Sequence, residues 1–291
     1  MKIPAYWWGH PCVRDVYNFG DLLTPLILGH YLSGYSIFLR PVRDIRAARI
    51  ISVGSLLQSI PEEQQCVIMG TGLIRPVDKR FRNAKIYAVR GALTRKFLSL
   101  PDDCKLGDPA ILICKVFTNI DRKDNKKIGI IPHMIHYNME IFDKYKNDNR
   151  YKVIDLQREP KDVVSDILSC KGIISSSLHG LIVADSYNIP NIRLKLDGLD
   201  GGDFKFDDYY TSVHREADAA SYLLPSQIDN YSFKEISYKE GIIRSQESIE
   251  LAINEFARTI TEIPFPLSRP SYSLCLIITY IKRLILDIIN R

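Results

Sequence analysis

The sequence predicts an α/β fold made of two Rossmann-like domains. Short runs of β-branched and other apolar residues alternate along the chain with segments of helical length, which is typical of parallel sheets whose strands are joined by crossover helices. Most of these runs stop at glycine, proline or serine. A charged stretch with few apolar residues, 119–127, separates two such series. We interpret this stretch as a linker between the domains.

In the first series, residues 1–118, we expect buried strands over 50–53, 66–69 and 85–89. A helix is expected to open at Asp21, and another to follow the third strand as far as Leu98. In the second series, residues 128–262, we expect strands over 128–131, 151–154, 172–174 and 192–196 and helices over 161–169 and 178–188. Ligands of such domains lie beyond the carboxyl ends of the strands, so the residues that follow each strand are the candidate site.

The composition is that of a globular protein, with 46% hydrophobic and 25% charged residues. It excludes a disordered, collagen-like or coiled-coil chain. A net charge of +5 over 291 residues is too mild to indicate nucleic acid as a partner. Six cysteines without a Cys-x-x-Cys pair favour a reducing cytosol over a zinc site or a disulfide framework. The N-terminus has no apolar signal-peptide core and no run spans a membrane, so we expect a cytoplasmic protein.

Two motifs of the first domain are candidates for contacts with a substrate. Asn18, Gly20 and Asp21 lie at an expected helix start, where an amide and a carboxylate can bind sugar hydroxyls. A simple capped helix explains the same residues equally well. Gly70 and Gly72 follow a strand and let backbone N–H groups approach an anion or a substrate, although a tight turn is an equally good interpretation.

Arg90 and His133 each follow an expected strand directly. The planar guanidinium of Arg90, beside a helix start, suits a carboxylate or a phosphate, and a surface salt bridge is the alternative. A single histidine such as His133 is usually structural. With His136 it could bind a metal only if further ligands were present, and none is evident, so we expect no metal site.

The motif with the most chemistry runs from Ile173 to Pro190. A buried strand leads into Ser175, Ser176 and Ser177, and His179 follows in the first turn of an apolar helix. Free N–H groups at a helix start bind anions, and a histidine there can donate a proton near neutral pH. The alternative is a run of capping serines with a partly buried histidine. A serine hydrolase is disfavoured because the sequence has no Gly-x-Ser-x-Gly motif.

Taken in order, these motifs resemble those of the polysaccharide pyruvyltransferase family. The matching pieces are Asn18-Phe19-Gly20-Asp21 with Pro25, Gly70-Thr71-Gly72, Val89-Arg90-Gly91 with Thr94, Gly107-Asp108-Pro109-Ala110, Pro132-His133, and Ser175-Ser176-Ser177-Leu178-His179-Gly180 with Ala184 and Pro190. The resemblance implies two domains arranged as in GT-B glycosyltransferases, with the active site in the interdomain cleft. It also implies transfer of pyruvate from phosphoenolpyruvate to a sugar of a surface polysaccharide or its lipid-linked repeat unit, as a cyclic ketal.

The resemblance further implies roles for individual residues. Phosphoenolpyruvate, the donor substrate, would lie on the second-domain side, and the sugar acceptor on the first-domain side near Asn18, Gly20, Gly70 and Gly72. His179 would protonate the donor, and Asp21 or His133 would act as the base. No metal or redox cofactor is implied.

Some family members carry Arg-Leu-His where this chain has Ser177-Leu178-His179. The donor contacts would then fall to Arg90, Ser177, Leu178, the helix start, and Arg193 or Lys195. Two other interpretations stay open. One is a glycosyltransferase of similar architecture that uses a nucleotide sugar. The other is a non-catalytic sugar- or anion-binding subunit, which only the absent arginine supports.

The last residues, 263–291, predict an amphipathic basic helix. An apolar stripe follows helical spacing, at Leu274, Ile277, Ile278, Ile281, Leu284, Ile285 and Ile288. This helix is expected either to pack on the body of the protein or to lie on an anionic inner membrane surface through residues 270–291. The second arrangement would bring a cytoplasmic enzyme to a lipid-linked acceptor.

Overall fold

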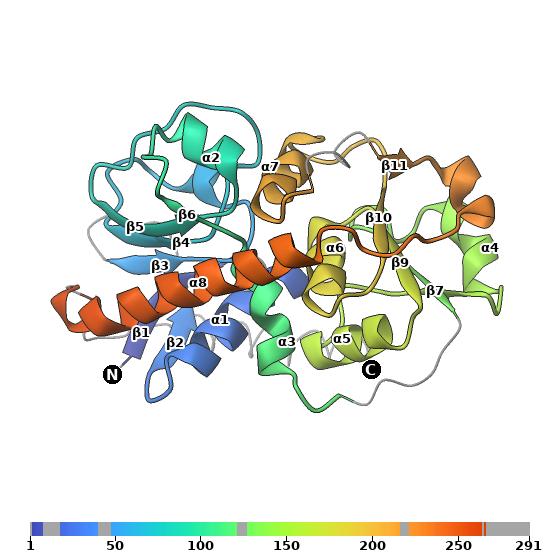
Figure 1. Ribbon diagram of the computed structural model, residues 1–291, viewed down its shortest axis with the longest axis horizontal. Helices are drawn as coiled ribbons and strands as arrows, with labels where there is room; N and C mark the ends of the chain where they lie inside the picture. Colours follow the sequence, from blue (N-terminus) through green and yellow to red (C-terminus); the bar gives the residue numbers. More distant parts are fainter. Residues whose placement is uncertain are drawn as a thin grey trace, which may run out of the picture.

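Two parallel β-sheets with helices packed against both faces make up the protein (Figure 1). The structure is a computed structural model that describes residues 2–7, 18–39, 48–120, 127–215, 221–263 and 265. The predicted α/β class and the two parallel sheets are confirmed. Residues 121–126 of the expected linker, and 264 and 266–291 of the expected C-terminal helix, lie outside the described residues.

The first sheet has the order β2-β1-β3-β4-β5-β6 and the second the order β11-β10-β9-β7-β8. The first sheet consists of β1 (Lys2–Tyr6), β2 (Ser36–Leu39), β3 (Arg49–Ile51), β4 (Cys66–Met69), β5 (Ala84–Val89) and β6 (Lys105–Leu106). The second consists of β7 (Ile128–Ile131), β8 (Tyr151–Val153), β9 (Gly172–Ser175), β10 (Asn191–Leu194) and β11 (Tyr222–Leu223).

The helices are α1 (Phe19–Tyr31), α2 (Ala92–Phe97), α3 (Ile113–Val116), α4 (Asp143–Lys146), α5 (Pro160–Leu168), α6 (Leu178–Ser186), α7 (Phe204–Ser212) and α8 (Lys239–Thr259). Short 3₁₀ turns connect them, η1 (Leu57–Ser59), η2 (Pro109–Leu112), η3 (Glu140–Phe142), η5 (Pro225–Asn230) and η6 (Ile260–Glu262). Among the helices in the described part of the chain, none is both long and apolar enough to cross a bilayer.

Both sheets share one strand order, in which the second strand of the series lies outside the first and the third lies on its other side. In this order the connections diverge between the first and third strands. That divergence leaves an open edge for a ligand beyond their carboxyl ends. The edge falls between β1 and β3 in the first sheet and between β7 and β9 in the second. His133 follows β7, and Ser176 and Ser177 follow β9, so these predicted site residues lie at the second switch point.

One apolar core runs through both halves of the molecule. It joins one face of the first sheet, including Ile3, Ile50 and Val67, to one face of the second, including Ile131 and Ile173. Helices α1, α5, α6 and α8 lie within it. The outer faces have separate, smaller clusters under α2 and under α4. The two sheets are therefore bound to each other by buried apolar surface rather than only by a linker.

Helix α8 connects the two halves a second time. It has 21 residues, and its buried positions recur at helical spacing, from Ile242 through Ile249 to Phe256. Figure 1 shows it lying across the first sheet, where Tyr87 Oη and Thr259 Oγ1 are 2.6 Å apart and Lys105 pairs with Glu255. Residues 239–262, which the sequence places in the second domain, therefore pack on the first sheet.

Buried polar contacts also join the halves. Arg90 at the end of β5 donates from Nε to Asp208 Oδ2 of α7 at 2.9 Å, and both side chains are fully buried. Asp208 also accepts from the backbone N–H and the hydroxyl of Thr94, each at 2.7 Å. A second, exposed pair joins Arg75 to Asp200. The two pairs bridge the same halves but differ completely in burial.

We therefore expect Asp208→Asn to lower the free energy of unfolding by about 3–5 kcal/mol, because it leaves the buried Arg90 guanidinium without a counter-charge. Asp200→Asn removes the exposed pair and should cost less than about 1 kcal/mol. Urea unfolding of both variants measures the difference. Equal, small effects would show that Arg90 does not depend on Asp208.

Candidate active site

The turn between β9 and α6 is held by two of its three serines. Ser175 Oγ accepts from the N–H of Ser177 at 3.0 Å and lies 2.8 Å from the carbonyl of the same residue. It also lies 3.0 Å from the carbonyl of Ile131 on β7. A side chain on Gly180 would collide with this hydroxyl at 2.4 Å, so the glycine lets the helix start fold back onto the strand.

Ser176 fixes the two histidines that follow β7. Its hydroxyl accepts from the backbone N–H of His133 at 2.8 Å and lies 3.1 Å from His136 Nδ1. His136 Nε2 lies 2.9 Å from the carbonyl of Asp197, which can only accept. Neutral His136 therefore carries its proton on Nε2 and accepts from Ser176 on Nδ1. Both ring nitrogens of His136 have protein partners, so its role is structural. His133 lies at the carboxyl end of β7.

Helix α6 opens at Ser177 without a cap. Ser177 has the extended backbone of an N-cap residue, yet its hydroxyl makes no capping bond. The alternative of a capping serine therefore does not hold for Ser177. Its side chain and the first N–H groups of the helix are available to an anion. Leu178, predicted to touch the donor, buries its side chain in the shared core, and its contact with the donor stays a prediction.

The N-termini of α1 and α6 meet at Gly20 and His179. A Cβ on Gly20 would lie 2.0 Å from His179 Nδ1, so only glycine allows this approach. The N–H of Phe19 donates to the carbonyl of Leu156 at 3.1 Å and fixes α1 against the second half. His179 Nε2 is buried without a hydrogen-bond partner among the described residues. The contact places Gly20, the chain neighbour of the predicted base Asp21, against the predicted acid His179 of the other half.

The site disfavours positive charge on its histidines. Burial is the main cause that lowers the pKa of His179 to about 3, and the charges of Lys205, Arg90 and His133 add to it. Burial also lowers the pKa of His133 to about 4, again with help from Lys205. Both rings are therefore neutral near pH 7 in the ligand-free protein. A bound anion would reverse the electrostatic part of these shifts.

Lys205 is the site residue that the sequence reasoning missed. It is the second residue of α7, and its side chain is only 7% exposed. Gly198, Gly201 and Gly202 lie shortly before it, and such a glycine-rich run is typical of a surface loop. The available signal was its position among apolar and aromatic residues, Phe204 and Phe206, which predict burial.

Arg193 and Lys195, on and after β10, share one carboxylate. Arg193 Nη2 donates to Asp203 Oδ1 at 2.5 Å, and Lys195 Nζ donates to Asp203 Oδ2 at 3.0 Å. Arg193 also stacks over the ring of Phe206, with 3.9 Å from Cζ to the ring centroid. Its Nε is buried without a partner in the described part of the chain. Both cations lie near the site, and Asp203 neutralises much of their charge.

Arg90 has all three of its guanidinium nitrogens bonded to protein oxygens. Besides Asp208, it donates from Nη1 to Ser55 Oγ and from Nη2 to the carbonyl of Leu73, each at 2.5 Å. Gly72 packs on the guanidinium, since a Cβ there would lie 2.4 Å from Arg90 Cζ. The guanidinium is placed at the interface between the halves, and its charge is felt by His179.

The first sheet contributes carboxyl groups at its own switch point. Asp21 is 5% exposed, and its Oδ1 lies 3.5 Å from the position that a Cβ on Gly54 would take. Asp108, fully buried, also binds the backbone of Gly54, and burial raises its pKa to about 6. Asp21 and Asp108 therefore converge on the turn after β3. With its raised pKa, Asp108 can hold a proton close to neutral pH.

The other residues predicted to contact the sugar acceptor have structural contacts with the backbone. Asn18 Oδ1 caps α1 by accepting from the N–H of Gly20 at 3.2 Å. Gly70 has a φ of +78° and packs on Pro109, and Gly72 donates to the carbonyl of Gly54 at 3.0 Å. The structure thus brings Gly20 and His179 together, with Asn18 and Asp21 close to Gly20 in the chain. It places Gly70 and Gly72 in the turns that hold Gly54 and Arg90.

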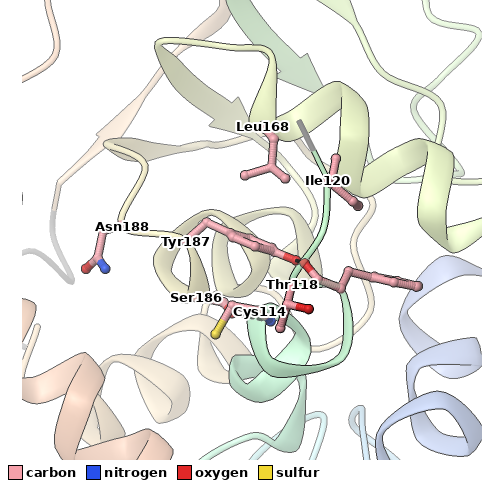
Figure 2. Close-up of a pocket in the computed structure, with 8 residues that line it drawn as sticks. Cys114, Thr118, Ile120, Leu168, Ser186, Tyr187 and Asn188 are labelled. Carbon is pink, nitrogen blue, oxygen red and sulfur yellow. Dashed lines mark hydrogen bonds between the residues drawn. The ribbon is translucent and has the colours of Figure 1, made fainter. Parts of the chain in front are cut away.

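Two hollows lie away from these residues. One, of about 340 Å³, is lined by residues such as Cys114, Phe117 and Tyr187 at the other end of α6 (Figure 2). The other, of about 540 Å³, lies near Arg150 and Lys171, where the strands of the second sheet begin. Neither contains a residue of the candidate site. Within the described ranges, no three His, Cys, Asp or Glu side chains converge as metal ligands.

The fold and the site together define a two-sheet parallel α/β protein with an anion-suited strand–helix turn. The sequence profile described as Polysaccharide pyruvyl transferase matches residues 18–198, which include β7, β9 and the start of α6. The chain therefore belongs to the polysaccharide pyruvyl transferase family, as the order of its motifs indicates.

The chain is also similar to two individual proteins. An uncharacterized protein of Acanthamoeba polyphaga mimivirus is 33% identical over 184 residues, which cover 57% of this chain and 60% of the relative. The succinoglycan biosynthesis protein ExoV of Rhizobium meliloti (strain 1021) is 24% identical over 179 residues, covering 60% of this chain and 54% of ExoV. The chain thus spans little more than half the length of each relative.

The contact between Gly20 and His179 predicts an unusual response to Gly20→Ala. Gly→Ala in a helix normally stabilises by about 0.4–1 kcal/mol. Here the new methyl group overlaps the imidazole, and we expect a loss of about 1–3 kcal/mol. Gly29→Ala on the same helix is the control, because a Cβ there meets no atom within 4 Å. In a His179→Ala background, Gly20→Ala should regain most of its loss. A loss that persists there would exclude the overlap as its cause.

The neutral histidines predict a specific acid sensitivity. The unfolded chain binds a proton at His179 near pH 6.5, whereas the folded chain resists protonation down to about pH 3, so stability falls as the pH drops below 6.5. We expect His179→Gln to reduce the loss of stability between pH 7.5 and pH 5 by about 1–2 kcal/mol. Urea midpoints at the two pH values measure it. An unchanged difference would show that the histidine takes up a proton in the folded protein.

Proposed function

We propose that this chain transfers pyruvate from phosphoenolpyruvate to a sugar of a surface polysaccharide or its lipid-linked repeat unit. The product is a cyclic ketal, and phosphate is released. Family membership supports the class of reaction. The observation that carries the proposal is the uncapped start of α6, with Ser177 and His179, placed against Gly20 and Asp21 of the first half. Donor and acceptor would meet there, between the two halves, as in a GT-B-like cleft.

The donor carries a carboxylate and a phosphate, and the second switch point is rich in groups that attract anions. Ser177 and the start of α6 offer donors, and the cations of β10, Arg193 and Lys195, lie nearby. Arg90 contributes its charge from a position where its nitrogens already bind protein oxygens. An anion bound at this edge would raise the pKa values of His179 and His133 from their low ligand-free values.

The reaction then requires two protons to leave the acceptor and two to be taken up by the products of the donor. Two sugar hydroxyls each lose a proton, C3 of the donor gains one, and the leaving phosphate gains the other. His179, charged once the donor is bound, gives the proton to C3, and the first hydroxyl adds to the cationic centre at C2. Asp21 or His133 accepts a hydroxyl proton. The second hydroxyl displaces phosphate and closes the ring. No step changes an oxidation state, so the proposal includes no redox cofactor and no metal.

The location of the acceptor at a membrane is predicted from the sequence alone. A lipid-linked acceptor and peripheral contact with the inner face of the membrane through residues 270–291 are predictions from the sequence. A nucleotide-sugar transferase would instead need a nucleotide site on the second half.

The test is phosphate release from phosphoenolpyruvate that depends on an oligosaccharide acceptor, with a matching gain in acceptor mass. His179→Ala should lower the rate by about 10²–10⁴-fold, because it removes a positioned acid. His30→Ala is the control, since His30 is exposed in the last turn of α1, about 15 Å along the helix from Gly20. Calorimetric binding of UDP or GDP, with none of phosphoenolpyruvate, would overturn the proposal in favour of a glycosyltransferase.

A further inference from the structure

Lys205 is a lysine whose side chain is almost completely buried. Its side chain is 7% exposed, and among the described residues it takes part in no hydrogen bond or ion pair. Its Nζ lies 5.6 Å from the centroid of the Phe206 ring. Lysine is almost never buried unless it is paired, because the desolvated charge costs several kcal/mol. Among the described residues, therefore, no hydrogen bond or ion pair compensates the charge of Lys205.

The surroundings of Lys205 add to this positive charge. Burial is the main cause that lowers its pKa to about 8, the charges of Arg90 and Arg193 lower it further, and Asp200 opposes them. Asp200 is exposed and already pairs with Arg75. The ammonium group in turn lowers the pKa values of His133, His136 and His179.

The position of Lys205 in its helix is also unfavourable for a cation. It is the second residue of the nine-residue helix α7, where the helix dipole is positive. Asp203, the residue before α7, makes no capping bond with its side chain. A lysine at a helix start among other cations lowers the stability of the fold. The same arrangement attracts an anion, so it suits an anion-binding site.

The other cations near the site are already neutralised. Arg90 binds Asp208, and Arg193 and Lys195 share Asp203. We propose that Lys205 is the principal cation that binds the anionic group, phosphate or carboxylate, of the donor at the edge formed by β7, β9 and the starts of α6 and α7. The identity of the donor rests on the proposed function, whereas the anion site does not.

This assignment predicts opposite effects on stability and binding. Lys205→Met removes an unsatisfied charge and keeps an apolar stem of similar length, so the ligand-free protein should melt at a higher temperature than the wild type. The same variant should lose at least about tenfold in affinity for inorganic phosphate and for phosphoenolpyruvate, because one charge-assisted contact of about 1.5–3 kcal/mol is removed. Phosphate should raise the melting temperature of the wild type and not that of the variant.

The experiment is calorimetric titration of the full chain with inorganic phosphate and with phosphoenolpyruvate, together with thermal unfolding with and without phosphate. Lys161→Met is the matched control, because Lys161 is the exposed second residue of α5, another nine-residue helix. It should bind both anions like the wild type. Lys205→Arg keeps the charge and should bind more tightly than Lys205→Met.

Unchanged phosphate binding in Lys205→Met would overturn the inference. So would a fall in its melting temperature or a failure to fold, since either would mean that the ammonium group stabilises the empty protein. Loss of anion binding in Lys205→Met, in a chain that shows no acceptor-dependent turnover, would support the anion site and refute the proposed transferase. Full turnover in Lys205→Met would support the proposed transferase and refute the role of Lys205 in anion binding.

Discussion

The close approach of Gly20 to His179 is the constraint on which the site depends. Two helices, each following a switch point of its own sheet, point their N-terminal ends at the same place, and the absence of a side chain at Gly20 allows it. The shared apolar core and α8 hold the halves in this arrangement. A methyl group at one position would push α1, and Asp21 with it, away from the start of α6. The geometry of the site is thus a property of how the halves pack, and neither sheet provides it alone.

The same arrangement concentrates positive charge. Four cations lie near the edge of the second sheet, Arg90, Arg193, Lys195 and Lys205. Among the described residues, carboxylates form ion pairs with the first three. Asp208 pairs with Arg90 at 2.9 Å, and this buried ion pair is part of the interface between the halves. Burial keeps His133 and His179 neutral, and the charge that remains adds to this effect. An anion bound there would offset the electrostatic part of these pKa shifts, so the proposed donor would favour protonation of the proposed acid.

Much of this could be predicted from the sequence because it is local. The runs 66–69, 128–131 and 172–175 are apolar, short and bounded by turn residues, and they form β4, β7 and β9. The predicted position of His179 in the first turn of a helix after a serine run follows from the same signals. Strand β1 was not predicted because Pro4 argues against a strand inside a sheet. Strands β6 and β11 are too short, at two residues each, to leave a pattern.

What could not be predicted depends on contacts between distant parts of the chain. Arg90 and Asp208 are 118 residues apart, and nothing near Arg90 reveals that its guanidinium is fully bonded. The apolar spacing of α8 predicts a helix, but not that the helix returns to the first sheet. Lys205 lies outside the residues that the family profile matches, on α7, which follows β10 only after the loop 195–203.

Ser177 shows why the absent arginine before Leu178 is weak support for a non-catalytic protein. An arginine at that position would place its charge at the start of α6. In this chain the start of α6 is uncapped and Ser177 leaves its hydroxyl available, while Lys205 brings an ammonium group into the same electrostatic environment from the start of α7. A site for an anion requires positive charge and hydrogen-bond donors at a given place, and the packing of the halves allows different elements to supply them. The loss of one residue from a motif therefore does not remove the charge that the motif is expected to provide.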